Sequence, residues 1–462
     1  MTGRQKHRRC LLHPVESDPP MLPVGTIPPS LSALLAVCRS CFTAPTFRTF
    51  CVLLTGLIAQ TRRRTVCGML LGTGLERVWH HARCHRLFST ARWSADEVGL
   101  ALAGLVVARL LPDGAPLQVA VDDTLFKRSG KKVFGAAWQH DGAARGPRPA
   151  GFGNCWVIAG IVVSVPFLTR PVCLPALARL WRPRHPEKIA LAREMTELLA
   201  AHFPDRTLHT VSDAAYAGEH LRGLHPQITW TSRLKVTSVL HELPPPRTGK
   251  KGRPRTRGPR LGTPTDLSQL LDWHRTKVRR YGRIDTVFLA ERTCLWYGSF
   301  HTQPVRVVLV RDSNCGPGTS RNRGYGAALV TTDLTTPAER IVERYAARWA
   351  IETAFFDARQ TLGVGEARNR TRHAVERTIP FGLLACTAVT TWHALAGHQP
   401  ADTDEHRARA RWYTTKTQPS FEDMTAKLRR TIIAHRFRGP HPHQAQPEEI
   451  QAVLTAWATA GT

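Results

Sequence analysis

The first hundred residues are dominated by apolar positions three and four residues apart, the pattern of helices packed against a core. Such segments lie at 31–43, 47–60 and 64–82. The clearest predicted helix begins at Ser94, which has capping-box spacing to Glu97, and it runs to the turn at Pro112-Asp113-Gly114. The sequence therefore predicts a helical region over 21–115, preceded by a polar, basic leader at 1–20 that we expect to be disordered.

After residue 115 the apolar pattern changes to short alternating or continuous runs, which favour strands. Two of these runs carry acids toward their ends: one contains Asp122 and Asp123, and the other ends at Asp213. A predicted helix at 186–203 lies between the two runs. Other strand-like segments lie at 132–138 and 155–168. Strands interleaved with a helix indicate an α/β fold, in which acids at neighbouring strand ends can meet at one edge of a mixed sheet.

The region 240–325 has a different composition. It opens with a Pro/Gly/Arg tract that predicts an exposed loop containing Lys250, Lys251, Arg253 and Arg255. Lys251-Gly-Arg-Pro254 is similar to the core of a hook that enters the DNA minor groove, and a solvated basic loop is the alternative. Strand-like segments predict a β-rich insertion at 285–291, 293–298 and 304–311, and the run at 326–333 returns the chain to the main sheet.

The segment 345–359, YAARWAIETAFFDAR, is predicted to be one helix. Helical spacing would gather Tyr345, Arg348, Glu352 and Arg359 within an arc of roughly 60°. The alternative is an ordinary amphipathic helix with a solvated polar face and an Arg348/Glu352 pair. Trp349 is expected in the core and not as a base-stacking platform. A mainly apolar helix at 378–396 and one or two helices within 421–462 are predicted to follow.

Charge is the most informative feature of the composition. The chain carries 64 Lys and Arg against 35 Asp and Glu, a formal net charge of +29, and this balance favours a polyanionic partner, most simply nucleic acid. GC-rich coding explains the excess of Arg over Lys better than it explains the net charge.

The cysteines and the apolar runs bear on where the protein works. The 11 cysteines are too scattered for a disulfide framework and predict reduced thiols in a cytoplasm. No set of cysteines and histidines shows both halves of a zinc site. The apolar runs at 98–111 and 155–168 are shorter than the ~20 residues that span a bilayer, so we expect no membrane association. We expect the protein in the cytoplasm, associated with the nucleoid.

The acids suggest a specific chemistry. Two divalent cations about 3.5 to 4 Å apart can bridge a scissile phosphate, and hard carboxylate oxygens hold such ions. Asp122 or Asp123, Asp213 and Glu352 supply a suitable set.

These residues also resemble a known family. The pattern Y-x2-R-x3-E-x6-K marks bacterial insertion-sequence transposases with a DDE triad, the insertion-sequence-four superfamily, and Arg359 stands here in the lysine position. The Val-Asp-Asp-Thr segment resembles the first-aspartate motif, which leaves Asp122 and Asp123 as alternatives. Val211-Ser-Asp213-Ala-Ala-Tyr216 resembles the second-aspartate motif, and Glu352 occupies the glutamate position.

The resemblance implies an RNase H-like catalytic core at 116–239 and 326–375, interrupted by the insertion at 240–325 and followed by a C-terminal helical region at 376–462. It also implies that the triad binds two Mg²⁺ ions, with Mn²⁺ as a substitute. Tyr345, Arg348, Arg359 and Arg233 are then candidates to contact DNA, together with the basic loop.

The implied activity is that of a DNA transposase. Such an enzyme binds terminal inverted repeats, pairs two transposon ends as a homodimer, cleaves the strand and transfers it to target DNA. Two alternatives stay open. One is an inactive or domesticated RNase H-like protein, and the other is a non-catalytic basic DNA-binding protein.

Overall fold

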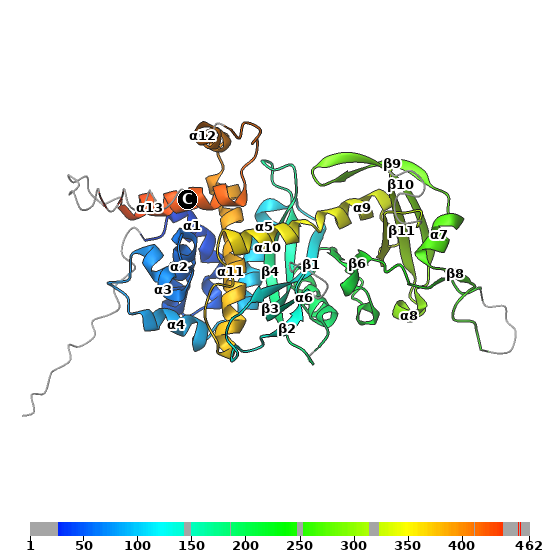
Figure 1. Ribbon diagram of the computed structural model, residues 1–462, viewed down its shortest axis with the longest axis horizontal. Coiled ribbons are helices and arrows are strands. Elements are labelled where there is room, and N and C mark those ends of the chain that lie inside the picture. The colour runs from blue at the N-terminus through cyan, green and yellow to red at the C-terminus, as the bar shows by residue number, and fades with distance from the viewer. Residues whose placement is uncertain are drawn as a thin grey trace, which may run out of the picture.

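The computed structural model describes residues 26–142, 149–184, 186–246, 253–313, 323–410, 412–437, 451 and 453. The predicted leader at 1–20 and two of the predicted DNA-binding residues, Lys250 and Lys251, lie outside this part of the chain. The molecule is elongated (Figure 1): helices α1 to α4, within residues 29–89, form one end, a mixed sheet runs through the middle, and the strands of the insertion form the other end.

The centre of the molecule is a mixed sheet whose strands follow the order β4-β3-β1-β5-β6. β1 is antiparallel to β3 and parallel to β5, and β5 is parallel to β6. The bounds are β1 Leu117–Lys127, β3 Ala150–Val163, β4 Val172–Trp181, β5 Leu208–Ser212 and β6 Ile228–Arg233. The observed β2, Ala137–His140, pairs with the start of β3, so most of the strand predicted at 132–138 is a turn.

The insertion extends this same sheet. β12 pairs with β6, and the order continues β12-β11-β10-β9, with each pair antiparallel. The bounds are β9 His274–Arg280, β10 Arg283–Cys294, β11 Val305–Asp312 and β12 Ala327–Thr331. The insertion also contains β7 Leu240–His241, β8 Arg260–Gly262 and α7 Pro264–Leu270. The strand predicted at 293–298 is wrong, because β10 ends at Cys294 and the helix α8, Tyr297–Phe300, follows.

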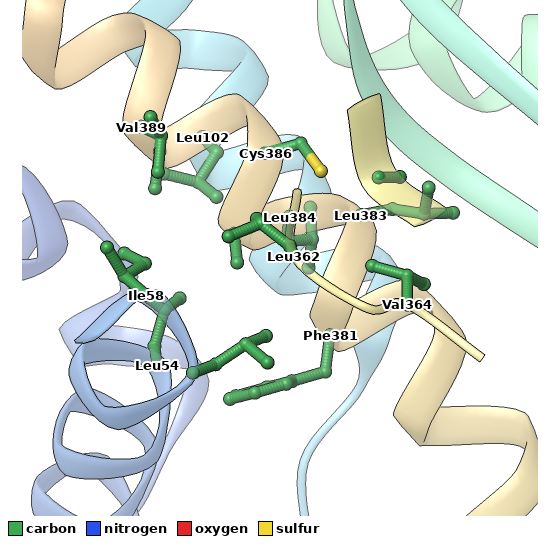
Figure 2. Close-up of a cluster of buried hydrophobic side chains, with 14 of the residues drawn as sticks. Leu54, Ile58, Leu102, Leu362, Val364, Phe381, Leu383, Leu384, Cys386 and Val389 are labelled. Carbon is green, nitrogen blue, oxygen red and sulfur yellow. The ribbon is translucent and has the colours of Figure 1, made fainter. Parts of the chain in front are cut away.

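Helices from both ends of the chain share one hydrophobic core. The N-terminal helices are α1 Pro29–Leu35, α2 Ala44–Ala59, α3 Val66–Thr73, α4 His81–Ser89 and α5 Ala95–Leu110. They pack with α11, Arg372–Trp392, and α13, Phe421–Phe437. Figure 2 shows part of this core, where Leu54 and Ile58 of α2 lie near Phe381 and Leu384 of α11. Burial of apolar side chains therefore holds the N-terminal and C-terminal helices together.

Two details of the helical region differ from or match the sequence pattern. The single helix predicted at 64–82 is wrong, because Gly74 ends α3 with a left-handed φ of 69° and α4 begins only at His81. The predicted start at Ser94 is confirmed, since its hydroxyl accepts a hydrogen bond from the Glu97 N–H at 3.4 Å.

The predicted helix over 345–359 is two helices. α9 spans Ala338–Ala347 and α10 spans Ala350–Gln360, with Arg348 and Trp349 in the turn between them. There the backbone tightens to bonds three residues apart: Arg348 N–H donates to the Tyr345 carbonyl at 3.1 Å, and Ile351 N–H donates to the Arg348 carbonyl at 3.0 Å. The prediction of one straight helical face is therefore wrong.

The long apolar helix was predicted at 378–396. It begins earlier, at Arg372, and a π-helical turn, His393–Gly397, continues it. Among the described residues, Arg372–Gly397 is long and apolar enough to cross a membrane by length and composition alone. However, 83% of its most apolar window is buried inside the protein, as in the core helix of a globular fold.

Candidate active site

The first and second predicted acids come from neighbouring parallel strands. The register pairs Leu117 with Leu208 and continues to Val121 with Ser212. Asp122 and Asp213 directly follow the last pair, so both lie at the same level of the sheet. β1 itself continues to Lys127 against β3, which places Asp122 inside a strand and Asp213 just beyond one. A parallel pair with matched acids thus brings two carboxylates together from positions far apart in the sequence.

Strand alternation separates Asp122 from Asp123. Successive side chains of a strand point to opposite faces. Ala120 and Phe126 belong to the core that includes α10, whereas Val119 and Val121 belong to the core that includes α6, Lys188–His202. Asp122 accordingly faces α10, and Asp123 faces α6.

The contacts of Asp123 agree with this placement. One carboxylate oxygen accepts a bond from the Lys188 Nζ at 2.7 Å, and the other accepts a bond from the Tyr216 hydroxyl at 2.7 Å. The Cys155 thiol also donates, at 3.3 Å, to the oxygen that Lys188 contacts. Asp123 is therefore fully engaged in tying β1 to α6 and to the turn after β5.

Arg348 joins Asp122 to the third predicted acid. Its Nη1 donates to Asp122 Oδ2 at 2.7 Å, and its Nη2 donates to Glu352 Oε1 at 2.8 Å. The side chains of Asp122 and Arg348 are 16% and 12% exposed, while that of Glu352 is 34% exposed. The turn between α9 and α10 thus aims one guanidinium at two carboxylates that come from a strand and a helix.

The charges of the cluster are poorly balanced. Burial raises the pKa of Asp122 to about 7 even though Arg348 lowers it, and the negative charge of Asp213 raises it further. One carboxylate oxygen of Asp213 caps the next turn, where it accepts a hydrogen bond from the Ala215 N–H at 2.8 Å. Asp122 and Glu352 therefore share one guanidinium, and Asp122 also lies close to the negative charge of Asp213.

This donor set suits a divalent cation. Carboxylate oxygens are the ligands that Mg²⁺ and Mn²⁺ prefer. An added cation would favour the ionised form of Asp122, which burial and Asp213 disfavour. The residues that would hold it are Asp122, Asp213 and Glu352, with Arg348 moved aside.

The predicted DNA-binding residues are distributed unevenly around this cluster. Arg233 is exposed at the end of β6, and the pairing of Ser212 with Ser232 places it beside Asp213. Arg348 stacks over the ring of Tyr345, with 5.8 Å from the guanidinium carbon to the ring centroid. Arg253 and Arg255 are exposed in the loop of the insertion.

Arg359 is placed differently. It lies over the Phe126 ring at 5.3 Å, and burial lowers its pKa. Within the described residues, no hydrogen bond or ion pair joins it to the three carboxylates. Its predicted contact with DNA stays a prediction.

The sequence patterns missed several residues near the cluster. Trp349 was expected in the core, but it is 52% exposed. Phe356, two helical turns later, is 61% exposed. The partnership of Lys188 with Asp123 had no sequence signal, because the two residues are 65 positions apart on different elements. Helical spacing of the aromatics at i and i+7 could have marked an exposed stripe on α10.

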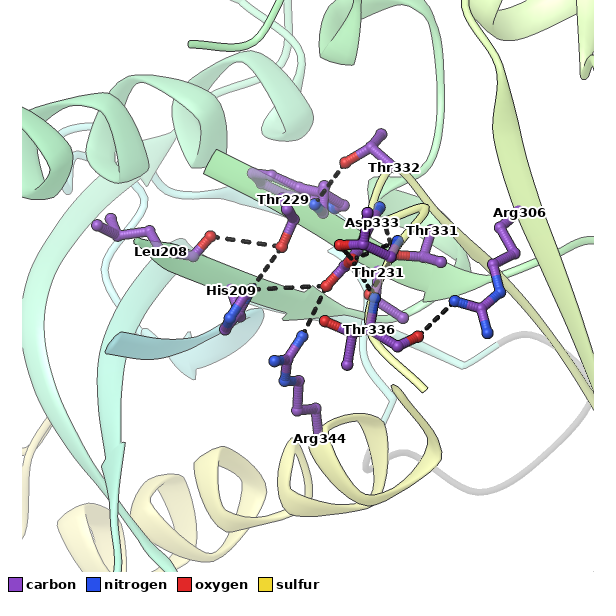
Figure 3. Close-up of polar contacts among 12 residues, drawn as sticks. Leu208, His209, Thr229, Thr231, Arg306, Thr331, Thr332, Asp333, Thr336 and Arg344 are labelled. Carbon is purple, nitrogen blue, oxygen red and sulfur yellow. Dashed lines mark hydrogen bonds and ion pairs between the residues drawn. The ribbon is translucent and has the colours of Figure 1, made fainter. Parts of the chain in front are cut away.

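A second buried carboxylate, Asp333, follows β12 (Figure 3). Burial alone would raise the pKa of this group, but hydrogen bonds from Thr336 and Thr335 and the ion pair with Arg344 hold it well below its usual range. The Arg344 Nη1 donates at 2.8 Å, and the Thr336 N–H donates at 3.0 Å. This network fastens the start of α9 to the sheet and so positions the turn that carries Arg348.

Comparison with known families defines the class of protein. The sequence matches the family described as DDE superfamily endonuclease over residues 38–294, more than half of the 462 residues, and the chain belongs to this family. The match contains both strand acids and ends before Glu352. No curated protein matches the sequence.

Membership confirms part of what the sequence predicted. The mixed α/β sheet with helices at both ends is the RNase H-like fold of this superfamily. Its enzymes act on DNA with divalent metal ions, so the chain has a transposase- or nuclease-type function.

Proposed function

We propose that the protein is the transposase of a bacterial insertion sequence of the insertion-sequence-four superfamily. The observation that carries this proposal is the grouping of three acids: Asp213 lies beside Asp122 on the neighbouring strand, and Arg348 joins Asp122 to Glu352. The strand-end acids and the helix glutamate occur in the order that the superfamily requires, and the β-rich insertion lies between the second and third acid. Asp122, and not Asp123, is then the first catalytic acid.

The three acids would hold two Mg²⁺ or Mn²⁺ ions. When bound, such ions activate the attacking oxygen and stabilise the leaving oxygen of a phosphodiester. Arg348 pairs with both Asp122 and Glu352, and it would be free to contact a phosphate oxygen if a cation took over these carboxylates. Asp123, through Lys188 and Tyr216, orients the strand and the turn that carry Asp122 and Asp213.

The DNA would lie across the exposed cations and aromatics that border the cluster. Arg233 is beside Asp213, and Trp349 and Phe356 expose their rings on the same helix pair as Arg348 and Glu352. Arginine contributes phosphate contacts and exposed rings contribute base stacking. We propose that Arg253, Arg255, Lys250 and Lys251 of the basic loop add affinity through phosphate or minor-groove contacts.

The proposal extends to the steps of transposition. The protein would bind the terminal inverted repeats, pair two ends as a homodimer, release a 3′-hydroxyl and direct it at target DNA. It would do so in the cytoplasm, at the nucleoid, where its substrate is.

A strand-cleavage assay tests the proposal. The substrate is DNA that carries the gene's own flanks, incubated with Mg²⁺, Mn²⁺ or EDTA, and wild type is compared with Glu352→Ala. We expect metal-dependent nicking at defined flank positions that the variant loses. Tight flank binding without any cleavage would favour an inactive or purely DNA-binding protein, and equal cleavage by Glu352→Ala would contradict the assignment of that residue.

A further inference from the structure

A second group of potential metal ligands lies at the other end of the long helix, where α11 gives way to α12, Asp402–Arg409. It consists of His393, the first residue of the π-helical turn, His398, which directly follows that turn, and Asp402, the first residue of α12. One potential ligand atom from each residue lies within 4.8 Å of the other two. None of the three belongs to the cluster on β1, β5 and α10.

His393 is the least satisfied member of this group. Its side chain is 1% exposed, yet neither ring nitrogen has a hydrogen-bond partner among the described residues. A buried polar group without a hydrogen-bond partner is destabilising and rare in folded proteins, so the burial of His393 needs an explanation. A neutral imidazole keeps a lone pair on one ring nitrogen, so His393 can offer that nitrogen to a metal ion.

The other two residues point toward the same space. His393 Nε2 and His398 Nδ1 each lie 3.8 Å from Asp402 Oδ2, beyond hydrogen-bond distance. His398 stacks on the Phe167 ring at 4.5 Å, and His393 meets the same ring edge-on at 5.2 Å. A phenylalanine on one side thus orients both imidazoles toward one carboxylate oxygen.

Asp402 is held in place by two donors. The Gln399 N–H donates to Oδ2 at 2.9 Å, and the Lys427 Nζ of α13 donates to Oδ1. A carboxylate oxygen has two lone pairs, so Oδ2 keeps one for a further partner. Lys427 fixes the carboxylate, although its positive charge also weakens the attraction for a cation.

We propose that His393, His398 and Asp402 form a zinc site that fastens α12 to the end of α11. Two neutral imidazoles and one carboxylate are ligands that Zn²⁺ takes, with water in the fourth position. Hard Mg²⁺ prefers oxygen donors and is the wrong ion for this set. Tetrahedral Zn²⁺ at about 2.0–2.1 Å from each ligand needs ligand atoms about 3.3 Å apart. The two His–Asp402 pairs at 3.8 Å need to close by about half an ångström, and the two histidine nitrogens, within 4.8 Å of each other, need to close by up to about 1.5 Å.

The π-helical turn supports this assignment. Its His398 N–H donates to the His393 carbonyl at 2.7 Å, a bond five residues long that brings the two rings to the same side. Such one-turn bulges within a helix are frequent at functional sites. A zinc ion here would join the ends of two helices, and Asp402 already connects to α13 through Lys427.

The test uses full-length protein freed of metal and titrated with Zn²⁺ alone in the presence of millimolar Mg²⁺, which occupies oxygen-only sites. Binding is measured against a chelating zinc indicator, and Co²⁺ is used as a spectroscopic substitute. We expect one tight zinc site, a rise in Tm on zinc addition, and visible Co²⁺ absorption of a four-coordinate site.

The variants make the assignment specific. His398→Ala is the main variant, because this ring is partly exposed and its loss should leave the fold intact, and it should weaken zinc binding at least tenfold. His274→Ala, on β9 at the far end of the sheet, is the matched control and should bind zinc as wild type does. Asp122→Asn should also leave the tight zinc site unchanged.

Three outcomes would overturn the proposal. One is the absence of a tight zinc site, and another is equal zinc affinity in wild type and His398→Ala. The third is a preference for Fe²⁺ over Zn²⁺ in purified, metal-replete protein. None of these results depends on strand cleavage, so the zinc site is tested independently of the proposed transposase activity.

Discussion

Two carboxylates on one sheet meet opposite environments. Asp333, after β12, accepts bonds from two backbone N–H groups and from Arg344, and its pKa lies well below the usual range. Asp122, on β1, shares Arg348 with Glu352 and lies near Asp213, and its pKa is raised to about 7. The negative charge of Asp333 is fully compensated by its hydrogen bonds and ion pair, whereas that of Asp122 is compensated only in part.

Asp123 sharpens this contrast because it is the next residue after Asp122. Lys188, Tyr216 and Cys155 satisfy it on the opposite face of the sheet. A satisfied acid is typical of a structural role, and clustered acids without enough positive charge are typical of a cation site. The comparison therefore separates neighbours that sequence motifs treat as equivalent.

The largest expected effect separates Asp122 from Asp123 in catalysis. Asp122→Asn removes a proposed metal ligand and should lower the rate of strand cleavage by at least about 1000-fold, or about 4 kcal/mol of transition-state stabilisation. Asp123→Asn keeps the metal ligands and should lower the rate by less than about tenfold. Cleavage of a flank substrate under single-turnover conditions measures both. Equal losses in the two variants would break the distinction between the faces of β1.

Asp333→Asn should act on stability. The change leaves Arg344 without its buried partner, which costs about 3 kcal/mol of unfolding free energy. The midpoint of urea denaturation, compared between wild type and variant at pH 7, measures this loss. Asp285→Asn in the insertion, where Arg280 keeps Asp312 as a second partner, is a control that should lose much less. An unchanged midpoint in Asp333→Asn would show that the network around it is not structural.

The free energy of unfolding should depend on pH because the environment of Asp122 disfavours its ionised form. The pKa of Asp122 is about 7 in the folded protein and 3.8 for a free side chain. The folded state therefore holds a proton that the unfolded state releases, and the free energy of unfolding falls as pH rises from about 4 to about 7. Asp122→Asn lacks this term and should be more stable than wild type at pH 8 without metal, by on the order of 2 kcal/mol.

Thermal unfolding at pH 4 and pH 8, in EDTA and in Mg²⁺, checks this expectation. Mg²⁺ should raise the Tm of wild type at pH 8 and so reduce the difference in Tm between wild type and Asp122→Asn. A wild type that gains stability between pH 4 and pH 8 relative to Asp122→Asn would show that Asp122 is well compensated.

The smallest expected effect concerns Arg348. Arg348→Met removes the guanidinium between Asp122 and Glu352 and also a proposed phosphate contact. Cleavage should slow by about tenfold, worth about 1.4 kcal/mol, while Mn²⁺ affinity is maintained or increases because a competing cation is gone. Rate and Mn²⁺ affinity are measured on the same preparations. Weaker Mn²⁺ binding in Arg348→Met would mean that Arg348 builds the cation site instead of standing in for the ion.

Much of the fold followed from local sequence patterns. Helices α2 and α5, β1, α6 and β5 lie close to their predicted positions, because apolar runs and clear turns mark them. β9 was missed, since His274–Arg280 is basic with a single fully buried residue, Val278, and has no apolar run to signal a strand. The break at Arg348 was missed because tertiary packing sets it while the helical spacing of the sequence continues through it.

The site was only partly predictable for a related reason. The acids were visible as residues at strand ends, but the choice between Asp122 and Asp123 depends on which face of β1 meets α10. Both faces of that strand are buried, so the usual alternation of apolar and polar positions is absent. The pairing of His393 with His398 and Asp402 needed the π-helical turn, which no spacing rule anticipates.

Direct measurement of Mn²⁺ binding tests the central claim most simply. Metal-free wild type, Asp122→Asn, Asp213→Asn, Glu352→Gln and Asp123→Asn would be titrated with Mn²⁺ and the free ion followed by electron paramagnetic resonance, with Zn²⁺ present to fill the histidine site. We expect at least tenfold weaker Mn²⁺ binding in Asp122→Asn, Asp213→Asn and Glu352→Gln, and wild-type affinity in Asp123→Asn. Mn²⁺ affinity that is lost in Asp123→Asn and retained in Asp122→Asn would contradict this claim.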